Sequence, residues 1–294
     1  MKSKVLQFII IFFAIIIFTG CSYDESADSI RIGLTIDESN PIAGEAASRA
    51  LAQAMEDFLG IPVIPILDIS YLMGIEAMRN GHLDIMLVSA FNYVRTSAVV
   101  DVELLVSLPM REGAANYSAF ITRADRDDIN SIHDLRGKTF AFVDAVSTMG
   151  FVFPSYHLVS ELGLNPNLIM LSGYFFDTAT FSGGHETNVI GVGMGDFDAA
   201  AIGAMFIENM DDRGIINAED FKIIAYTRPV PNPGYIVRSA LDPEIIENIR
   251  TFFLGFDDPA YFAENWGDGG LRFTYPDIEG FEYVRSMAET LGLN

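Results

Sequence analysis

Residues 228–234 read Arg-Pro-Val-Pro-Asn-Pro-Gly, and they interrupt the regular structure late in the chain. Three prolines within five residues cannot continue a helix or an inner strand, because proline has no backbone N–H and a fixed φ. Residues 111–114, Arg-Glu-Gly-Ala, form a second break, a polar turn between two predicted strands. Two such crossings predict that residues 29–114 and 227–294 form lobe 1 and that residues 115–226 form an inserted lobe 2.

The rest of the chain alternates between strand and helix signals, and no internal repeat is evident. Short apolar runs predict strands at 30–36, 63–67, 83–88, 104–108, 117–121, 139–143, 168–171, 197–202 and 221–226. Apolar faces at helical spacing predict helices at 47–58, 71–79, 187–192, 243–253 and 280–291. This order predicts an α/β protein in which each lobe has a mostly parallel sheet flanked by helices. A ligand is then expected beyond the carboxyl ends of the strands, in the cleft between the lobes.

The N-terminus has the parts of a secretory signal peptide. Lys2 and Lys4 precede an apolar run from Phe8 to Phe18, which is too short to span a bilayer comfortably. The run ends in Phe18-Thr19-Gly20-Cys21, which resembles the bacterial lipobox, although that pattern prefers Leu where this chain has Phe18. We therefore expect residues 1–20 to be a signal peptide, Cys21 to carry a lipid such as palmitate, and residues 21–28 to be an acidic tether. The alternative is a buried thiol at the end of a membrane anchor.

Composition excludes several classes of function. The formal charge is −22, so the surface repels nucleic acid, and we expect no nucleic-acid partner. The single cysteine allows no internal disulfide and no thiolate cluster for a metal. We find no zinc-protease motif, no Walker loop and no Ser–His–Asp spacing, so we expect no catalytic residues, no metal and no cofactor. We expect a monomer on the extracytoplasmic face of the cell membrane.

Two clusters could carry binding chemistry. Ser147-Thr148-Met149-Gly150 follows a predicted strand and opens a helical stretch, where hydroxyl and N–H groups can hold an oxyanion. Pro154 lies past the first turn of that helix, so we expect the turn to be irregular. The second cluster is Gly183-Gly184-His185, in which the imidazole could donate a hydrogen bond to an anion. The alternatives are a plain helix cap and a structural histidine.

From Ile30 to the C-terminus, the chain resembles the phosphonate- and phosphite-type substrate-binding proteins of ABC transporters. The resemblance rests on the order and spacing of Arg31-Ile32-Gly33-Leu34, Ile69-Ser70-Tyr71, Glu76 to Ile85, Ser147 to Pro154, Gly184-His185-Glu186 and Gly195 to Ala200. It implies the two-lobed, hinge-closing fold of type II periplasmic binding proteins and docking on the transmembrane subunits of an ABC permease. It also implies that Tyr71, Tyr117, Ser147, Thr148, Gly150 and His185 hold the oxygen atoms of a small oxyanion. Ser89 is a further possible donor by its position.

This chain departs from the family pattern at three of the site positions. Met149 stands where the family has a second serine. Met205 and Asn232 stand where members that take aminoalkyl phosphonates have carboxylates for the ammonium group. A buried ammonium without a carboxylate partner would be costly, so we expect phosphite, methylphosphonate or another alkylphosphonate, and not an aminoalkyl ligand. Met149 and Met205 would then supply apolar contacts.

Other functions remain open on the same fold. The protein could be a sensory lipoprotein that reports a ligand to a signalling partner. It could also be a receptor for an unrelated organic ligand or an extracytoplasmic enzyme, because a fold does not determine a function.

Overall fold

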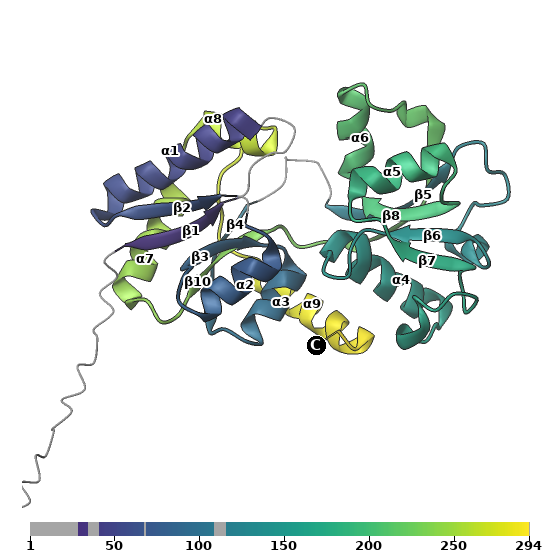
Figure 1. The fold of residues 1–294 in the computed structure, drawn as a ribbon, viewed down its shortest axis with the longest axis horizontal. Coiled ribbons are helices and arrows are strands. Elements are labelled where there is room, and N and C mark those ends of the chain that lie inside the picture. Colours follow the sequence, from purple (N-terminus) through teal and green to yellow (C-terminus); the bar gives the residue numbers. More distant parts are fainter. Residues whose placement is uncertain (1–28, 35–40, 68, 109–115, 294) are drawn as a thin grey trace, which may run out of the picture.

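The computed structural model describes residues 29–34, 41–67, 69–108 and 116–293 (Figure 1). The predicted signal peptide, Cys21, the tether to residue 28 and the break at 111–114 therefore lie outside the described residues. Within the described ranges, no helix is long and apolar enough to span a bilayer.

Lobe 1 is built on a five-stranded sheet in the order β2-β1-β3-β10-β4. Its strands are β1 (Ile30–Leu34), β2 (Val63–Leu67), β3 (Ile85–Val88), β4 (Val102–Ser107) and β10 (Gly234–Arg238). Only β10 runs against its neighbours, so the other strands all point one way and the sheet is mostly parallel, as predicted.

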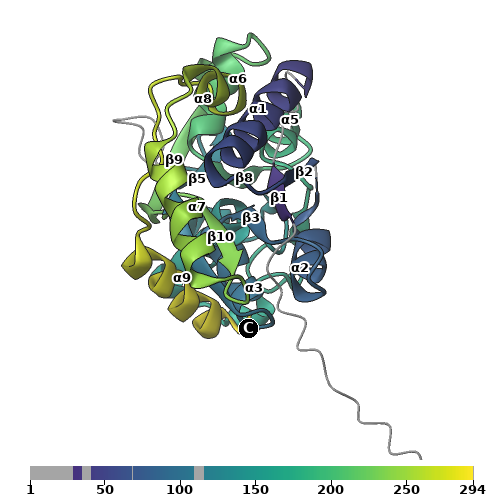
Figure 2. The same ribbon diagram turned by 90° about the vertical axis from the view of Figure 1, so that its left-hand side faces the viewer.

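Both faces of this sheet are covered by helices, which explains why β3 is buried along its whole length. Side chains alternate between the two cores: Ile85 and Leu87 face one side, and Met86 and Val88 face the other. The first core includes side chains of α1 (Pro41–Leu59), α7 (Pro243–Gly255) and α8 (Pro259–Trp266). The second includes those of α2 (Tyr71–Arg79), α3 (Ala90–Ser97) and α9 (Ile278–Leu291). Figure 2 looks at lobe 1 from its outer side, where α1 and α7 lie.

Lobe 2 has a second five-stranded sheet in the order β7-β6-β8-β5-β9, with β5 as its reversed strand. The strands are β5 (Tyr117–Arg123), β6 (Thr139–Phe142), β7 (Thr178–Phe181), β8 (Ala199–Gly203) and β9 (Phe221–Pro229). One face packs on α4 (Phe153–Leu162), and the other packs on α5 (His185–Met194) and α6 (Met205–Asp212). Short helices complete the lobe: η1 (Ile132–Leu135), η2 (Thr148–Val152), η3 (Pro166–Leu168) and η4 (Ala218–Asp220).

Most predicted elements are present, but one predicted strand is wrong. The apolar residues 168–171 do not form a strand; they end η3 and continue into a turn. Ile169 is apolar because it is buried in the core, not because it belongs to a sheet. The strand of this region is β7, which sequence reasoning missed together with α3, α6, α8 and β10.

The two chain crossings run side by side. The N–H of Val230 donates to the carbonyl of Asn116 at 2.6 Å, and the N–H of Leu108 donates to the carbonyl of Pro233 at 2.9 Å. The Asn116 side-chain amide also donates to the Val230 carbonyl at 3.1 Å. The proline-rich segment does interrupt the strands, because β9 ends at Pro229 and β10 begins at Gly234. The exact residues at which each lobe begins and ends stay a prediction.

The two lobes repeat one structural unit that the sequence does not make obvious. In lobe 1, the fully buried Asp84 carboxylate precedes β3, accepts the Arg31 N–H at 2.8 Å and pairs with the Arg238 guanidinium at 2.7 Å. In lobe 2, Asp198 precedes β8 and accepts the Thr139 N–H at 2.8 Å. Each aspartate ties the third parallel strand of its lobe to the first strand.

The C-terminal helix α9 contacts both lobes. It packs against α3 of lobe 1 and against α4 and η2 of lobe 2, and Figure 1 shows it along the lower edge between them. Phe281, Val284 and Met287 of α9 lie in the same core cluster as Phe91 of α3 and Val152 of η2. The lobes are therefore joined by packed apolar side chains as well as by the crossings.

Candidate ligand-binding site

The predicted site residues lie where strands end. Tyr71 begins α2 after β2, Ser89 precedes α3 after β3, Ser147 precedes η2 after β6, His185 begins α5 after β7, and Met205 begins α6 after β8. These are the carboxyl ends of the parallel strands in both sheets, the place where open α/β sheets bind ligands. Thr148, Met149 and Gly150 follow Ser147 in η2, and Tyr117 and Asn232 lie in or beside the crossings.

The turn at Ser147 is an irregular helix start, as predicted. η2 is one turn of π-helix, and α4 follows it with Pro154 near its beginning. Ser147 Oγ accepts the Gly150 N–H at 2.9 Å and so caps the turn. A Cβ at residue 150 would lie 2.3 Å from Val143 Cβ, so only glycine fits there. The N–H groups of Thr148 and Met149, the first two residues of the turn, have no acceptor within the helix and can bind an anion.

Thr148 links the two lobes through its hydroxyl, which was not expected. Its Oγ1 accepts the Phe91 N–H of α3 at 3.0 Å and donates to Ser89 Oγ at 2.9 Å. The residue is only 3% exposed. The structure therefore brings Ser89 of lobe 1 directly to the Ser147–Gly150 turn of lobe 2. It also commits the Thr148 hydroxyl to that contact, so the backbone N–H is the group of Thr148 left for a ligand.

His185 is held in one tautomer. Its Nδ1 accepts the Gly203 N–H at 3.0 Å, and its ring stacks on Phe206 with centroids 4.3 Å apart and planes at 14°. Burial lowers the pKa of His185 to about 4, so the imidazole is neutral at physiological pH. A neutral ring whose Nδ1 accepts must carry its proton on Nε2, which leaves one N–H donor for a ligand.

Two methionines lie against Gly203, the residue that bonds to His185. A Cβ at Gly203 would lie 2.8 Å from Met205 Sδ and 3.1 Å from Met149 Cε. The same atom would lie 3.2 Å from Phe206 Cδ2. The wall beside His185 is thus apolar where the family pattern can have a carboxylate. Sequence reasoning missed Phe206, because α6 has few apolar residues outside its first turn and was not predicted.

The other predicted residues lie at the edges of this group. Tyr71 is 39% exposed at the start of α2. Tyr117 has its ring 5.9 Å from that of Tyr226, and its carbonyl accepts the Ala204 N–H at 2.9 Å, next to Met205. Asn232 helps to line a cavity of about 540 Å³ in the crossing, together with Arg228 and Tyr283.

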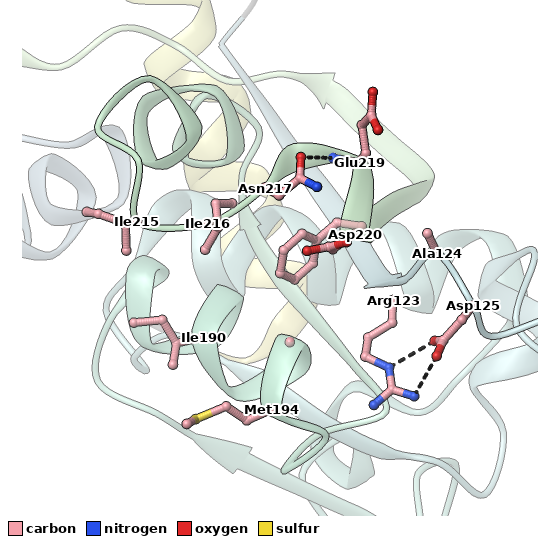
Figure 3. Close-up of a pocket in the computed structure, with 12 residues that line it drawn as sticks. Arg123, Ala124, Asp125, Ile190, Met194, Ile215, Ile216, Asn217, Glu219 and Asp220 are labelled. Carbon is pink, nitrogen blue, oxygen red and sulfur yellow. Dashed lines mark hydrogen bonds and ion pairs between the residues drawn. The ribbon is translucent and has the colours of Figure 1, made fainter.

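A different cavity, of about 580 Å³, lies on lobe 2 and contains none of the predicted residues (Figure 3). Arg123 at its edge forms two hydrogen bonds to the Asp125 carboxylate, at 2.9 and 3.0 Å. These bonds also lower the pKa of Asp125. The one guanidinium drawn there is therefore neutralised by its neighbour, and this cavity offers an oxyanion no free cation among the residues shown.

Comparisons with known proteins show which family the chain is similar to. Residues 36–272 match the family model described as "ABC transporter, phosphonate, periplasmic substrate-binding protein". The chain is 28% identical over 218 residues to the phosphate-import protein PhnD of Mycolicibacterium smegmatis, which covers 71% of this chain and 66% of that protein. It is 27% identical over 202 residues to the tetrathionate sensor histidine kinase TtrS of Salmonella typhimurium, which covers 65% of this chain and 32% of the kinase.

The fold has solved relatives. PhnD1 from Prochlorococcus marinus, solved in complex with methylphosphonate, superposes with a TM-score of 0.70 at 18% identity, over 91% of this chain and 99% of that one. At this identity the likeness shows the periplasmic-binding-protein fold alone, in agreement with the prediction. The matched family consists of binding proteins, not enzymes. Because its model covers most of the chain, the protein belongs to the family of periplasmic substrate-binding proteins of phosphonate ABC transporters.

Proposed function

We propose that this protein captures a small phosphonate or phosphite between its lobes and delivers it to an ABC permease. The oxyanion would be held by the N–H groups of Thr148 and Met149, the hydroxyls of Ser89, Ser147, Tyr71 and Tyr117, and His185 Nε2–H. Charge-assisted hydrogen bonds from several fixed donors can hold an anion without a lysine or arginine. This suits a chain with a net charge of −22.

We further propose that the ligand is phosphite, methylphosphonate or another alkylphosphonate, and not an aminoalkyl phosphonate. The observation that carries this is the apolar wall at Gly203, where Met149, Met205 and Phe206 come together beside His185. An ammonium group there would lose its water without gaining a carboxylate. An alkyl group would instead gain apolar contacts.

A thermal-shift panel tests the ligand. The protein is heated with phosphite, methylphosphonate, 2-aminoethylphosphonate, phosphate and sulfate. A ligand at about 100 times its Kd should stabilise the folded state by about 2.7 kcal/mol. Ser147→Ala should weaken the shift, because it removes a hydroxyl donor and the cap of η2. Ser286→Ala is the matched control, because Ser286 lies on the exposed side of α9 and its hydroxyl donates to the Tyr283 carbonyl. Tight binding of the amino compound, or no shift with any oxyanion, would contradict the proposal.

We also propose that Cys21 is lipidated and that the mature protein is anchored to the extracytoplasmic face of the membrane. The basic leader, the short apolar run and the Thr-Gly-Cys ending support this. Membrane fractionation and mass spectrometry of the native protein test it. A Cys21→Ser variant should lose both the lipid mass and the membrane fraction. A wild-type protein with an unmodified thiol would contradict the anchor.

Sensing is a second candidate, favoured by the similarity to the TtrS kinase over 202 residues. A strain that lacks this gene separates the two roles. Loss of growth on methylphosphonate as the phosphorus source indicates transport. Normal growth with loss of a ligand-dependent transcriptional response indicates sensing.

A further inference from the structure

A third cavity, larger than the two described above, contains none of the candidate site residues. It has a volume of about 700 Å³ and lies where α2, α3 and α9 meet residues 145–146 of lobe 2. Figure 1 shows α3 between α2 and α9 on this side of the molecule. Small-molecule sites in proteins commonly have volumes of about 300–1,000 Å³, so this cavity is large enough for a second ligand.

Apolar side chains form most of the wall of this cavity. Ile75 and Val94 are buried, and Val146 is half-buried. Leu72 is 60% exposed and Val99 is 52% exposed, so part of the apolar wall faces water. Apolar side chains that are exposed together mark ligand or partner sites more often than single ones do. A ligand with an apolar body would remove this surface from water.

Arg95 of α3 lines the same cavity and differs from the other cations of the chain. Each of the other lysines and arginines in the described ranges has an ion pair, a hydrogen bond or a ring contact there, whereas Arg95 has none of these. The chain has 40 acidic and 18 basic residues, so a cation without a carboxylate partner is unexpected. Arg95 is also half-buried, and its planar guanidinium can bind a carboxylate through two hydrogen bonds.

The other charged groups of the cavity restrict the ligand further. Arg285 bonds to Glu282 at 3.1 Å, and Glu76 lies 3.7 Å from Arg79. Glu289 of α9 has no such partner among the residues that the structure describes. An unpaired glutamate is ordinary in so acidic a chain, so Glu289 alone does not indicate a ligand. It would repel a simple anion, however, and it could accept hydrogen bonds from an ammonium group.

We propose that this cavity binds a small zwitterion with an apolar body, such as a free amino acid with an apolar side chain. Arg95 binds its carboxylate, Glu289 binds its ammonium group, and the apolar wall covers its side chain. The ligand has no net charge, so the net charge of −22 does not repel it. The proposal does not rest on the proposed function, because the cavity shares no lining residue with the candidate oxyanion site.

Calorimetric titration of the purified protein with leucine and its derivatives tests the ligand class. The measurements are made at about pH 6, where α-amino groups are protonated. Leucine should bind, and N-acetylleucine, which lacks the ammonium, and leucinamide, which lacks the carboxylate, should each bind about tenfold more weakly or less. Glycine, which lacks the apolar side chain, should bind more weakly than leucine. If leucine does not bind, or if either derivative binds as tightly as leucine, the proposal is wrong.

Two variants assign the two charged groups. Arg95→Gln should lower the affinity for leucine to that of leucinamide and should leave leucinamide itself unchanged. Glu289→Gln should lower the affinity for leucine to that of N-acetylleucine and should leave N-acetylleucine unchanged. This crossed pattern distinguishes a lost contact from a lost fold, because a misfolded variant would lose every probe.

Arg49→Gln is the matched control. Arg49 is an exposed arginine on α1, which packs on the opposite face of the lobe 1 sheet, and it pairs with Glu45 at 2.9 Å. Its replacement should change none of the affinities. If leucine binds equally well to the wild type and to Arg95→Gln, or if the control loses the same affinity as Arg95→Gln, the cavity is not the site.

Discussion

Replacing Thr148 by valine removes a hydroxyl of lobe 2 that bonds to α3 of lobe 1, with almost no change in volume. The Phe91 N–H is buried and would lose its acceptor, which costs about 1–3 kcal/mol. Ser89 would lose one of two donors but keeps that of Asn92, and it is only half-buried, so it adds little. We therefore expect the free energy of unfolding to fall by about 2 kcal/mol, a factor of about thirty in the equilibrium constant.

Urea unfolding and small-angle scattering test this expectation. Thr96→Val is the matched control, since Thr96 is equally buried but donates only to the Asn92 carbonyl within α3, at 2.7 Å. The control should lose about 1 kcal/mol or less and keep the radius of gyration. Thr148→Val should lose more and should shift the ligand-free protein toward a larger radius, and Thr148→Ser should restore both values. If Thr148→Val behaves like the control in both measurements, the hydroxyl does not hold the lobes together.

Three further predictions follow from other contacts. Met205→Glu should bind 2-aminoethylphosphonate measurably by calorimetry, because it supplies the missing carboxylate; Met205→Gln, without the charge, should not. Asp84→Asn should destabilise the fold by about 3–5 kcal/mol, because it leaves Arg31 and Arg238 beside a neutral buried group. Asp198→Asn should cost less in the same urea titration, because its side chain is 28% exposed. The folded-state pKa of His185 is depressed, so the unfolded chain binds more protons below about pH 6.5, and stability should fall between there and about pH 4. His185→Gln should lose that part of the pH dependence of the urea midpoint; an unchanged slope would contradict the neutral, buried imidazole.

The elements with a strong burial pattern could be predicted from the sequence. α1 has a regular apolar face, and β3 is a continuous apolar run because helices cover both of its sides. β7 escaped prediction because it is an edge strand with half-exposed side chains, so Thr178 to Phe181 has no apolar run. Residues 168–171 were wrongly predicted to form a strand, because Ile169 is buried without being in a sheet.

The candidate site could be predicted in part. Ser147, Gly150 and His185 lie in short motifs with a local reason for each residue, and the structure places these motifs at strand ends. The partners of these residues come from distant segments: Ser89 meets Thr148 across 59 positions, and His185 meets Gly203 and Phe206 across a whole helix and strand. The first contact depends on the packing of the two lobes, and the second on the packing of α5 against β8 and α6 within lobe 2, and no local pattern encodes either.

The position of β10 has a consequence for the order in which the protein can be assembled. Lobe 2 is one continuous segment, but the sheet of lobe 1 is completed only by Gly234–Arg238, which insert between β3 and β4. Until those residues emerge, β3 and β4 have no partner on that side, and their inner edges offer unpaired N–H and C=O groups. A chain that crosses a membrane N-terminus first would therefore have a finished lobe 2 beside an unfinished lobe 1. These open edges can pair with other chains until Gly234–Arg238 have crossed.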